Sequence, residues 1–270
     1  MTLAHRTQVL TGLILAALLL VGASQPALAG SVRTLTLSSG GSLAANDDGY
    51  STAQPMGFTI NFFGVNYSNA YISNNGLINF DAGTSAWIPM GLQTYAHPTI
   101  AAFWADVDTR APGSGLTTWG QAMVNGHKAF VVNWPHVGQY NQNGTYLNTF
   151  QIVLIDRSDT GAGNFDIELN YDLIGWDHGG AGVGYTNGLT PPTYYELPGS
   201  NTPSAFITGG SRDLVANSNV GTPGRYIFEA RNGNVSANPT PSVPLPPTLV
   251  LVGTGLLGYG ALRLRRRRRA

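Results

Sequence analysis

The sequence contains no cysteine, and only 10% of its 270 residues are charged. The absence of cysteine excludes a disulfide framework, a thiolate metal site and a cysteine nucleophile. Average soluble proteins carry about 25% charged residues, so uncharged polar groups must make up much of the surface that faces water. Hydrophobic residues make up 43% of the chain, which is enough for a sizeable core.

Sequence motifs of catalysis and nucleotide binding are missing from the body of the chain, residues 30–242. Its four histidines show no H-E-x-x-H spacing, and the body contains no G-x-S-x-G, Walker or G-x-G-x-x-G sequence. We therefore expect neither an enzyme nor a nucleotide cofactor.

Positive charge is scarce in this body as well. The fourteen basic and fourteen acidic residues of the chain balance, but six of the basic ones are arginines within the last eight positions. The body holds seven basic residues and all fourteen acidic ones, and its net charge is therefore −7. Such a body repels phosphate backbones, so we do not expect nucleic acid as a partner.

The first 29 residues have the organisation of a secretory signal peptide. A basic region at residues 5–6 precedes an apolar stretch at 9–21 and an A-x-A site at 27–29. We expect cleavage between Ala29 and Gly30. An uncleaved membrane anchor is the alternative, but the apolar stretch is shorter than the roughly 20 residues that a spanning helix needs.

The C-terminus combines three segments. A proline-rich segment at 243–248 is followed by an apolar stretch of small residues at 249–262 and a basic cluster. This cluster consists of Arg263, Arg265, Arg266, Arg267, Arg268 and Arg269. A transmembrane helix over about 248–262 would be short, because each residue adds only about 1.5 Å, but the arginines can extend its reach. By the positive-inside rule they hold the terminus in the cytoplasm and leave the body outside.

This order of segments resembles the PEP-CTERM sorting signal of exported bacterial proteins, over residues 243–270. Besides the arginines, the matching positions are Val243, Pro244, Leu245, Pro246 and Thr248, with leucine at 245 where the family usually has glutamate. The resemblance implies that exosortase, a membrane-embedded transpeptidase-like enzyme, recognises and cuts the chain here. The protein would then be exported, transiently anchored in the membrane, and placed at the cell surface or in the extracellular matrix. A plain membrane anchor is the alternative.

The body is predicted to be a single all-β domain at residues 30–232, with its core at 57–230. Short apolar runs bounded by Gly, Asn, Asp or Pro are typical of a mostly antiparallel β-sandwich. The predicted strands are Val32–Leu37, Gly57–Phe63, Ala70–Ser73, Leu77–Phe80, Ile100–Trp104, Ala129–Trp134, Thr149–Ile155, Phe165–Tyr171, Ala181–Tyr185 and Arg225–Glu229. Helices are expected only in the two terminal signals, and residues 233–247 are expected to form an Asn/Pro/Ser-rich linker.

Two local patterns in this domain are distinctive. Asn74-Asn75-Gly76 predicts a tight hairpin turn of type I′, because Asn-Gly tolerates positive φ. Residues 165–172 alternate strictly between apolar and polar side chains, and we interpret the polar side as a solvated sheet face. Asp166 and Glu168 on that face are about 7 Å apart by strand rise, so a glycosidase acid/base pair is the alternative.

The body also resembles the nidogen-like (NIDO) domain of extracellular matrix and adhesion proteins, over about residues 57–230. The sequences that carry this resemblance are Phe58–Tyr67, Tyr71–Phe80, Ile100–Asp108, Asn148–Asp156, Phe165–Trp176, Val183–Gly188 and Leu197–Ser200. The resemblance implies extracellular adhesion or matrix association, without known catalysis.

Two pairs of residues are candidates for ligand binding. Asp106 and Asp108 follow an apolar strand and offer the hard oxygen ligands that Ca²⁺ prefers, although acids in such positions more often cap turns or pair with a nearby arginine. Trp119 and Trp176 lie beside glycine and aspartate, and we expect them at the surface, where they could stack on sugar rings. Trp104 is expected in the core, and the Asn46–Gly49 segment is expected to be a turn.

These observations predict an exported, non-catalytic adhesion or matrix-association module. Its expected partners are an exosortase-type enzyme and extracellular polysaccharide or surface proteins, and no cofactor is expected other than the Ca²⁺ that Asp106 and Asp108 could bind. The alternative is an exported hydrolase that acts on matrix polysaccharide.

Overall fold

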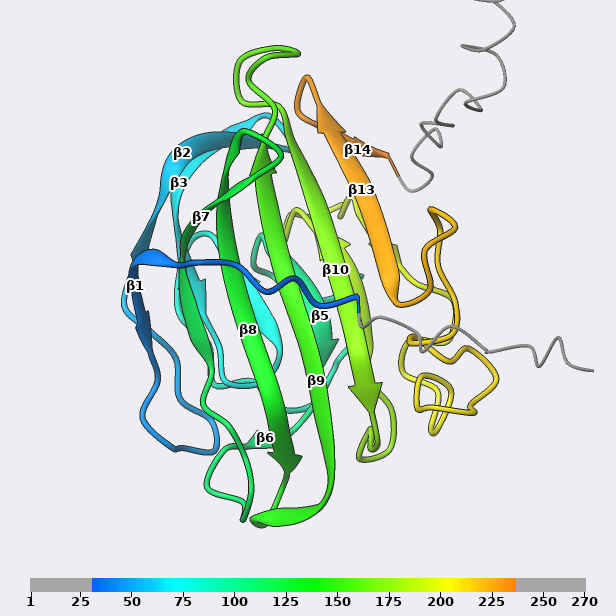
Figure 1. Cartoon of the computed structure of the whole chain (residues 1–270). Helices are drawn as coiled ribbons and strands as arrows, with labels where there is room; N and C mark the ends of the chain where they lie inside the picture. The colour runs from blue at the N-terminus through cyan, green and yellow to red at the C-terminus, as the bar shows by residue number, and fades with distance from the viewer. Residues whose placement is uncertain (1–30, 237–270) are drawn as a thin grey trace, which may run out of the picture.

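The computed structural model describes residues 31–236, which form two β-sheets that face each other (Figure 1). This confirms the all-β, sandwich-like prediction for the described part of the chain. Within that part, no helix is long and apolar enough to cross a membrane. The predicted signal peptide, its cleavage site, the sorting motif and the arginine cluster lie outside the described residues.

The first sheet is formed mainly by long antiparallel strands. In spatial order it contains β1 (Ser38–Ser42), β7 (Thr118–Val124), β8 (His127–Gln139), β9 (Asn143–Asp156), β10 (Phe165–Ile174), β13 (Arg225–Arg231) and β14 (Asn234–Ser236). The short strand β6 (Val107–Asp108) pairs with the far end of β8.

The second sheet is smaller and is also antiparallel. Its order is β12 (Tyr194–Glu196), β11 (Gly182–Thr186), β5 (Thr99–Trp104), β4 (Leu77–Asn79), β3 (Val65–Ile72) and β2 (Gln54–Phe62). Strand β5 lies in the middle of this sheet and is buried along its whole length. It leads directly into β6, so the bend at residues 105–106 connects the two sheets.

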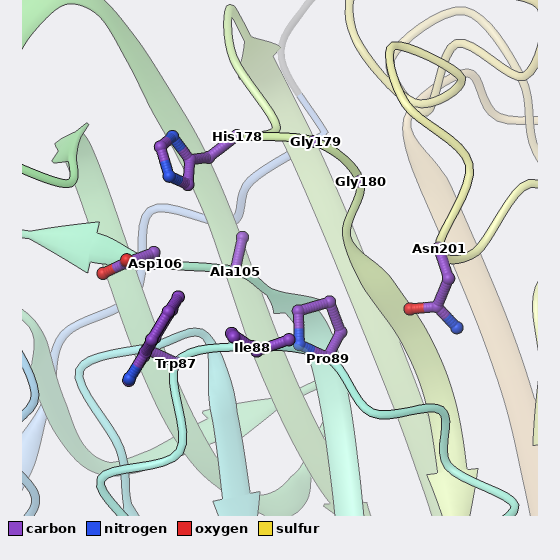
Figure 2. Close-up of a pocket in the computed structure, with 9 residues that line it drawn as sticks. All are labelled: Trp87, Ile88, Pro89, Ala105, Asp106, His178, Gly179, Gly180 and Asn201. Atoms are coloured by element: carbon purple, nitrogen blue, oxygen red, sulfur yellow. The ribbon is translucent and has the colours of Figure 1, made fainter.

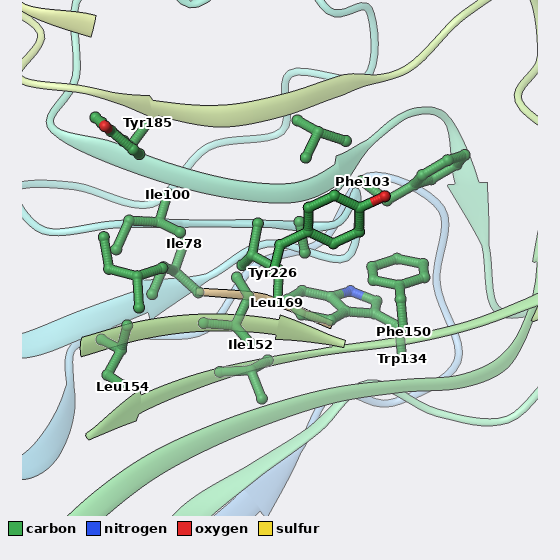
Figure 3. Close-up of a cluster of buried hydrophobic side chains, with 14 of the residues drawn as sticks. Ile78, Ile100, Phe103, Trp134, Phe150, Ile152, Leu154, Leu169, Tyr185 and Tyr226 are labelled. Atoms are coloured by element: carbon green, nitrogen blue, oxygen red, sulfur yellow. The ribbon is translucent and has the colours of Figure 1, made fainter. Parts of the chain in front are cut away.

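The main core fills the space between the two sheets. Figure 3 shows Ile78 and Ile100 of the second sheet facing aliphatic side chains of β9 and β10. Beside them, the Trp134 and Phe150 rings stack with their centroids 5.0 Å apart. The Tyr171 hydroxyl donates a 2.7 Å hydrogen bond to the carbonyl of Ala102, which ties β10 to β5 across the core.

The N-terminal segment at residues 31–37 covers the outer face of the first sheet. In Figure 1 this blue segment crosses β10, β9 and β8 before it reaches β1. The predicted strand Val32–Leu37 is therefore wrong, and the first strand begins at Ser38. The segment bonds to side chains instead of a neighbouring strand, since the Val32 amide donates to Asp172 and the Arg33 amide donates to Gln151. Its apolar residues Leu35 and Leu37 pack on a second buried cluster on that face.

The other nine predicted strands are confirmed, although β3, β8 and β9 extend well beyond the predicted limits. Prediction missed β7, because Thr118–Val124 contains glycine and glutamine among its apolar residues. It also missed the short strands β6, β12 and β14, which have too few residues to show an alternation.

The Asn74-Asn75-Gly76 turn is confirmed as the hairpin connection between β3 and β4, but it is not of type I′. Type I′ requires positive φ at two central residues, and here only Gly76 has it, at +82°. The Ser73 amide donates to the carbonyl of Leu77 and closes a three-residue loop with a left-handed glycine. Both asparagine side chains are fully buried, and they organise the neighbouring site.

Candidate functional site

Three carboxylates from distant parts of the chain meet beside the asparagine turn. Asp47 and Asp48 lie in the loop between β1 and β2, and Asp106 lies at the bend between β5 and β6. One oxygen of each carboxylate lies within 4.8 Å of the others. We call these three residues the acidic cluster.

The two buried asparagines hold the acidic cluster together. The Asn74 amide group donates to the carbonyls of Asn46, Asp47 and Val107. The Asn75 amide nitrogen donates to the Asp48 carboxylate at 2.9 Å, while its oxygen accepts from the Val107 amide at 2.9 Å. The loop and the β5–β6 bend are thus both fixed to one hairpin turn. The Asn46–Gly49 turn itself is confirmed by a hydrogen bond from the Gly49 amide to the Asn46 side chain.

The Asp106 carboxylate and one oxygen of Asp47 are left without hydrogen bonds among the described residues. Asp106 is only 5% exposed, and its carboxylate accepts no hydrogen bond there. Burial, followed by the charges of Asp47, Asp48 and Asp108, raises the pKa of Asp106 to about 6. Asp47 Oδ1 is likewise buried without a partner. Burial and the neighbouring Asp108 also raise the pKa of Asp47, although Arg110 opposes this change.

Asp108, which the sequence pairs with Asp106 as a metal ligand, is fully buried and has a different role. Its carboxylate accepts hydrogen bonds from the Arg110 guanidinium and from the backbone amides of Arg110 and Gln142. Burial opposes its ionisation, but these hydrogen bonds outweigh burial and lower its pKa. Its oxygens are therefore engaged, which matches the arginine pairing considered as the alternative. Asp106 instead faces Asp47 and Asp48.

A pocket of about 160 Å³ lies next to Asp106. Figure 2 shows Trp87 and Asp106 at one end of it, His178 near them, and Asn201 at the other end. Trp87 is 44% exposed, and its neighbours Ile88 and Met90 are exposed as well. The pocket therefore combines an aromatic ring, a carboxylate and an apolar rim. Sequence reasoning did not single out Trp87, although its position in a proline-containing loop is a signal for exposure.

Trp119 and Trp176 do not form the surface platforms that the sequence suggested. They are only 6% and 4% exposed. The indole N–H of Trp119 donates to Gln54, and that of Trp176 donates to the carbonyl of Val137. Both prefer the core because a large ring gains more from burial when its single donor is satisfied. Trp104 is fully buried, as expected.

Asp166 and Glu168 do not lie on a solvated face, because the N-terminal segment and neighbouring arginines cover them. Glu168 is 1% exposed and accepts hydrogen bonds from the Arg33 guanidinium at 2.6 and 3.0 Å, with Arg225 at 3.3 Å. Asp166 is paired with Arg157 and Arg231. Each carboxylate is therefore held by two arginines, and neither lies on the open, solvated face that the sequence suggested.

Comparison with known proteins gives the family. The family model of the Nidogen-like domain matches residues 68–232. Alpha-tectorin of Mus musculus is 30% identical over 223 residues, which cover 68% of this chain and 10% of that protein. Nidogen of Drosophila melanogaster is 26% identical over 205 residues, which cover 63% of this chain and 14% of that protein.

These relatives are much longer proteins, and the chain spans about a tenth of alpha-tectorin and a seventh of the fly nidogen. No solved structure matches the chain significantly. The family match begins within β3 and ends just after β13, so it includes strands of both sheets and the β5–β6 bend that carries Asp106. The chain therefore belongs to the nidogen-like domain family.

Proposed function

We propose that this protein is an exported, non-catalytic module that associates with the extracellular matrix or with other molecules at the cell surface. The observation that carries the proposal is the nidogen-like domain, which occupies most of the described residues. The signal-peptide pattern at residues 1–29 supports export. The C-terminal pattern supports sorting by an exosortase-type enzyme, with the body on the outer side of the membrane.

The arrangement of the carboxylates favours binding over hydrolysis. A glycosidase needs one carboxylic acid and one carboxylate that both reach the substrate, about 5–9.5 Å apart. Asp166 and Glu168 are each paired with two arginines, and Glu168 is also bound by Arg33 of the N-terminal segment. The acidic cluster gathers one oxygen from each of three carboxylates within 4.8 Å, an arrangement that suits a shared cation.

The pocket beside Trp87 is the surface that best suits a partner. An exposed indole ring next to polar groups can stack on the apolar face of a sugar while the polar groups bind its hydroxyls. The body carries a net charge of −7, so neutral glycans or proteins are better partners for it than anionic polymers. Many copies on one surface would add avidity to contacts that are individually weak.

The test measures binding and turnover together. The purified full chain is incubated with matrix polysaccharide, and both co-sedimentation and the release of reducing ends are followed. We expect co-sedimentation without turnover, and we expect Trp87→Ala to weaken binding at least fivefold. The matched control is Met123→Ala, since Met123 is 58% exposed on β7 and does not line this pocket.

Two results would contradict the proposal. Sustained release of reducing ends that disappears in Asp166→Asn or Glu168→Gln, with the fold retained, would establish the hydrolase instead. If the protein binds neither matrix polysaccharide nor cell-surface proteins, the proposed association with the matrix is wrong.

A further inference from the structure

We propose that Asp47, Asp48 and Asp106 bind a Ca²⁺ ion that joins the β1–β2 loop to the β5–β6 bend. This site differs from the Asp106–Asp108 pair that the sequence suggests, because Asp108 is already bound by Arg110. The proposal goes beyond matrix association, since it concerns an ion site that can be tested without any polysaccharide.

The first argument is the geometry of the three carboxylates. Their oxygens lie within 4.8 Å of one another, so each can reach one central ion at the 2.3–2.6 Å that Ca²⁺ requires with only small side-chain movements. They also come from two segments that are 58 residues or more apart in the chain, yet the Asn74 and Asn75 side chains fix both segments. The cluster is therefore held together by buried hydrogen bonds that do not involve the ion.

The second argument is that a buried oxygen of Asp47 and the carboxylate of the buried residue Asp106 have no hydrogen-bond partner among the described residues. Native structures satisfy the large majority of buried polar atoms, and an unpaired buried carboxylate is especially costly. Asp106 is about nineteen-twentieths buried and accepts no hydrogen bond in the described chain. Asp47 Oδ1 is the buried side-chain atom without a partner in this part of the chain. A cation placed between Asp106 and Asp47 Oδ1 would give both of them a partner.

The third argument is the charge balance. Four carboxylates lie close together here, namely those of Asp47, Asp48, Asp106 and Asp108. Arg110 is the cation paired with members of this group, and it contacts Asp108 and only the other oxygen of Asp47, Oδ2. Asp106 receives no contact from Arg110, so a negative charge remains on the side of the cluster where Asp47 Oδ1, Asp48 and Asp106 meet. A divalent ion would neutralise it.

The ligand chemistry selects Ca²⁺ among the common divalent ions. All three ligands are carboxylate oxygens, which suit Ca²⁺ and Mg²⁺, whereas Zn²⁺ prefers histidine and cysteine. Mg²⁺ demands a near-ideal octahedron at about 2.0–2.1 Å, while Ca²⁺ accepts six to eight oxygens in irregular positions. Asp47 and Asp48 are partly exposed, so water can complete the shell of the larger ion. Three carboxylates supplemented by water predict a modest affinity, in the range of about 10⁻⁴–10⁻³ M of extracellular Ca²⁺ modules.

The test titrates the purified full chain, stripped with EDTA, with CaCl₂ and separately with MgCl₂. We expect the melting temperature to rise with Ca²⁺ and to rise much less with Mg²⁺ at the same concentration. Tb³⁺, which replaces Ca²⁺ in oxygen sites, should show luminescence sensitised by Trp87, because that ring lines the same pocket as Asp106. Excess Ca²⁺ should displace the Tb³⁺ signal.

The variants identify the ligands. Asp106→Asn and Asp48→Asn should each weaken Ca²⁺ binding at least tenfold, whereas Glu229→Gln, which removes a carboxylate from β13 outside the cluster, should leave it unchanged. Asp48 is more exposed than Asp106, so its variant keeps the test valid if Asp106→Asn fails to fold. A missing Ca²⁺ response in the wild type, or a response in both cluster variants as strong as that of the wild type, would overturn the site. Either result would leave matrix binding measured in EDTA unaffected, so the two proposals can fail separately.

Discussion

At the scale of single residues, the charged groups of this domain differ sharply in how their charge is balanced. Glu168 and Asp166 each have two arginine partners, and Asp108 is bound by Arg110. Asp106, although almost fully buried, has neither an arginine nor a hydrogen-bond donor in the described part of the chain. Removing one partner of a buried ion pair commonly costs about 3–5 kcal/mol, whereas removing an uncompensated charge is favourable. Substitutions at Asp106 and at Glu168 should therefore change stability in opposite directions.

The Asp106→Asn variant should be more stable than the wild type in EDTA, and the gain should increase with pH. The pKa of Asp106 is raised to about 6 in the folded protein, above its unfolded value, so ionisation in the folded state costs free energy. The stability that the protonated form confers is fully present below pH 4 and is lost as the pH rises to about 6. Urea unfolding at pH 4.5 and pH 7.5 should show a difference between wild type and variant that is larger at pH 7.5, by about 1–2 kcal/mol. A difference that is equal at both pH values would contradict the raised pKa.

At the scale of elements, the hairpin turn between β3 and β4 connects the fold to the site. Gly76 accepts the amide hydrogens of Ala102 and Phe103 at its carbonyl, and its left-handed conformation turns the chain beneath β5. Added to this glycine, a Cβ atom would overlap the carbonyl oxygen of Phe103. The preceding two asparagines then reach Asp48 and the backbone of the β1–β2 loop and the β5–β6 bend. A change in this one turn therefore affects both the second sheet and the acidic cluster.

Gly76→Ala should lose far more stability than Gly64→Ala, although both glycines have nearly the same positive φ. Gly76 is at +82° and Gly64 is at +86°, so the backbone strain of alanine, about 1–2 kcal/mol, is common to both. No atom lies within 4 Å of a Cβ at Gly64, whereas the Phe103 backbone blocks one at Gly76. We expect the Gly76 variant to cost at least about 2 kcal/mol more. Chemical unfolding of both variants measures the difference, and equal losses would show that the strain of the turn alone decides stability.

At the scale of the whole molecule, both sheets have their outer faces covered by irregular segments. Residues 31–37 cover the first sheet (Figure 1), and a loop that includes Leu92 and Tyr95 packs on Leu77, Ala101 and Trp104 of the second. In the loops around the β5–β6 bend, the exposed Trp87 and the unpaired carboxylate of Asp106 line one pocket.

Sorting is predicted to cut the protein near Val243, so that the surface form lacks the residues from about Val243 onward. Replacing Arg265 through Arg269 with glutamine should disturb membrane retention, because these charges set the orientation of the C-terminal segment. Epitope tags placed on each side of Val243, followed through cell fractionation, measure both processing and retention. The intact mass of the surface form should lack Arg269. A surface form that still contains Arg269 would mean that the C-terminus is a simple anchor.

The sequence by itself determined those properties that depend on neighbouring residues. Alternation at 165–171 identified β10 and its core face, and Asn74-Asn75-Gly76 identified a hairpin connection. The ordered segments of the body also identified the nidogen-like family, which the family match confirms. The strand and the hairpin need only the local period of the chain and the conformational freedom of glycine, whereas the family was recognised from its resemblance to known sequences.

Only the tertiary structure decided which residues meet. Period-two alternation places Asp166 and Glu168 opposite the core, but it does not show that Arg33 of the N-terminal segment covers Glu168, because that contact joins positions 135 apart. Likewise, the D-x-D pattern suggested that Asp106 and Asp108 bind a metal ion together. In the structure Asp108 accepts hydrogen bonds from Arg110, and Asp106 lies beside Asp47 and Asp48. The burial of Trp119 and Trp176 could not be predicted from neighbouring residues either, because the exposure of a ring depends on what the rest of the chain packs against it.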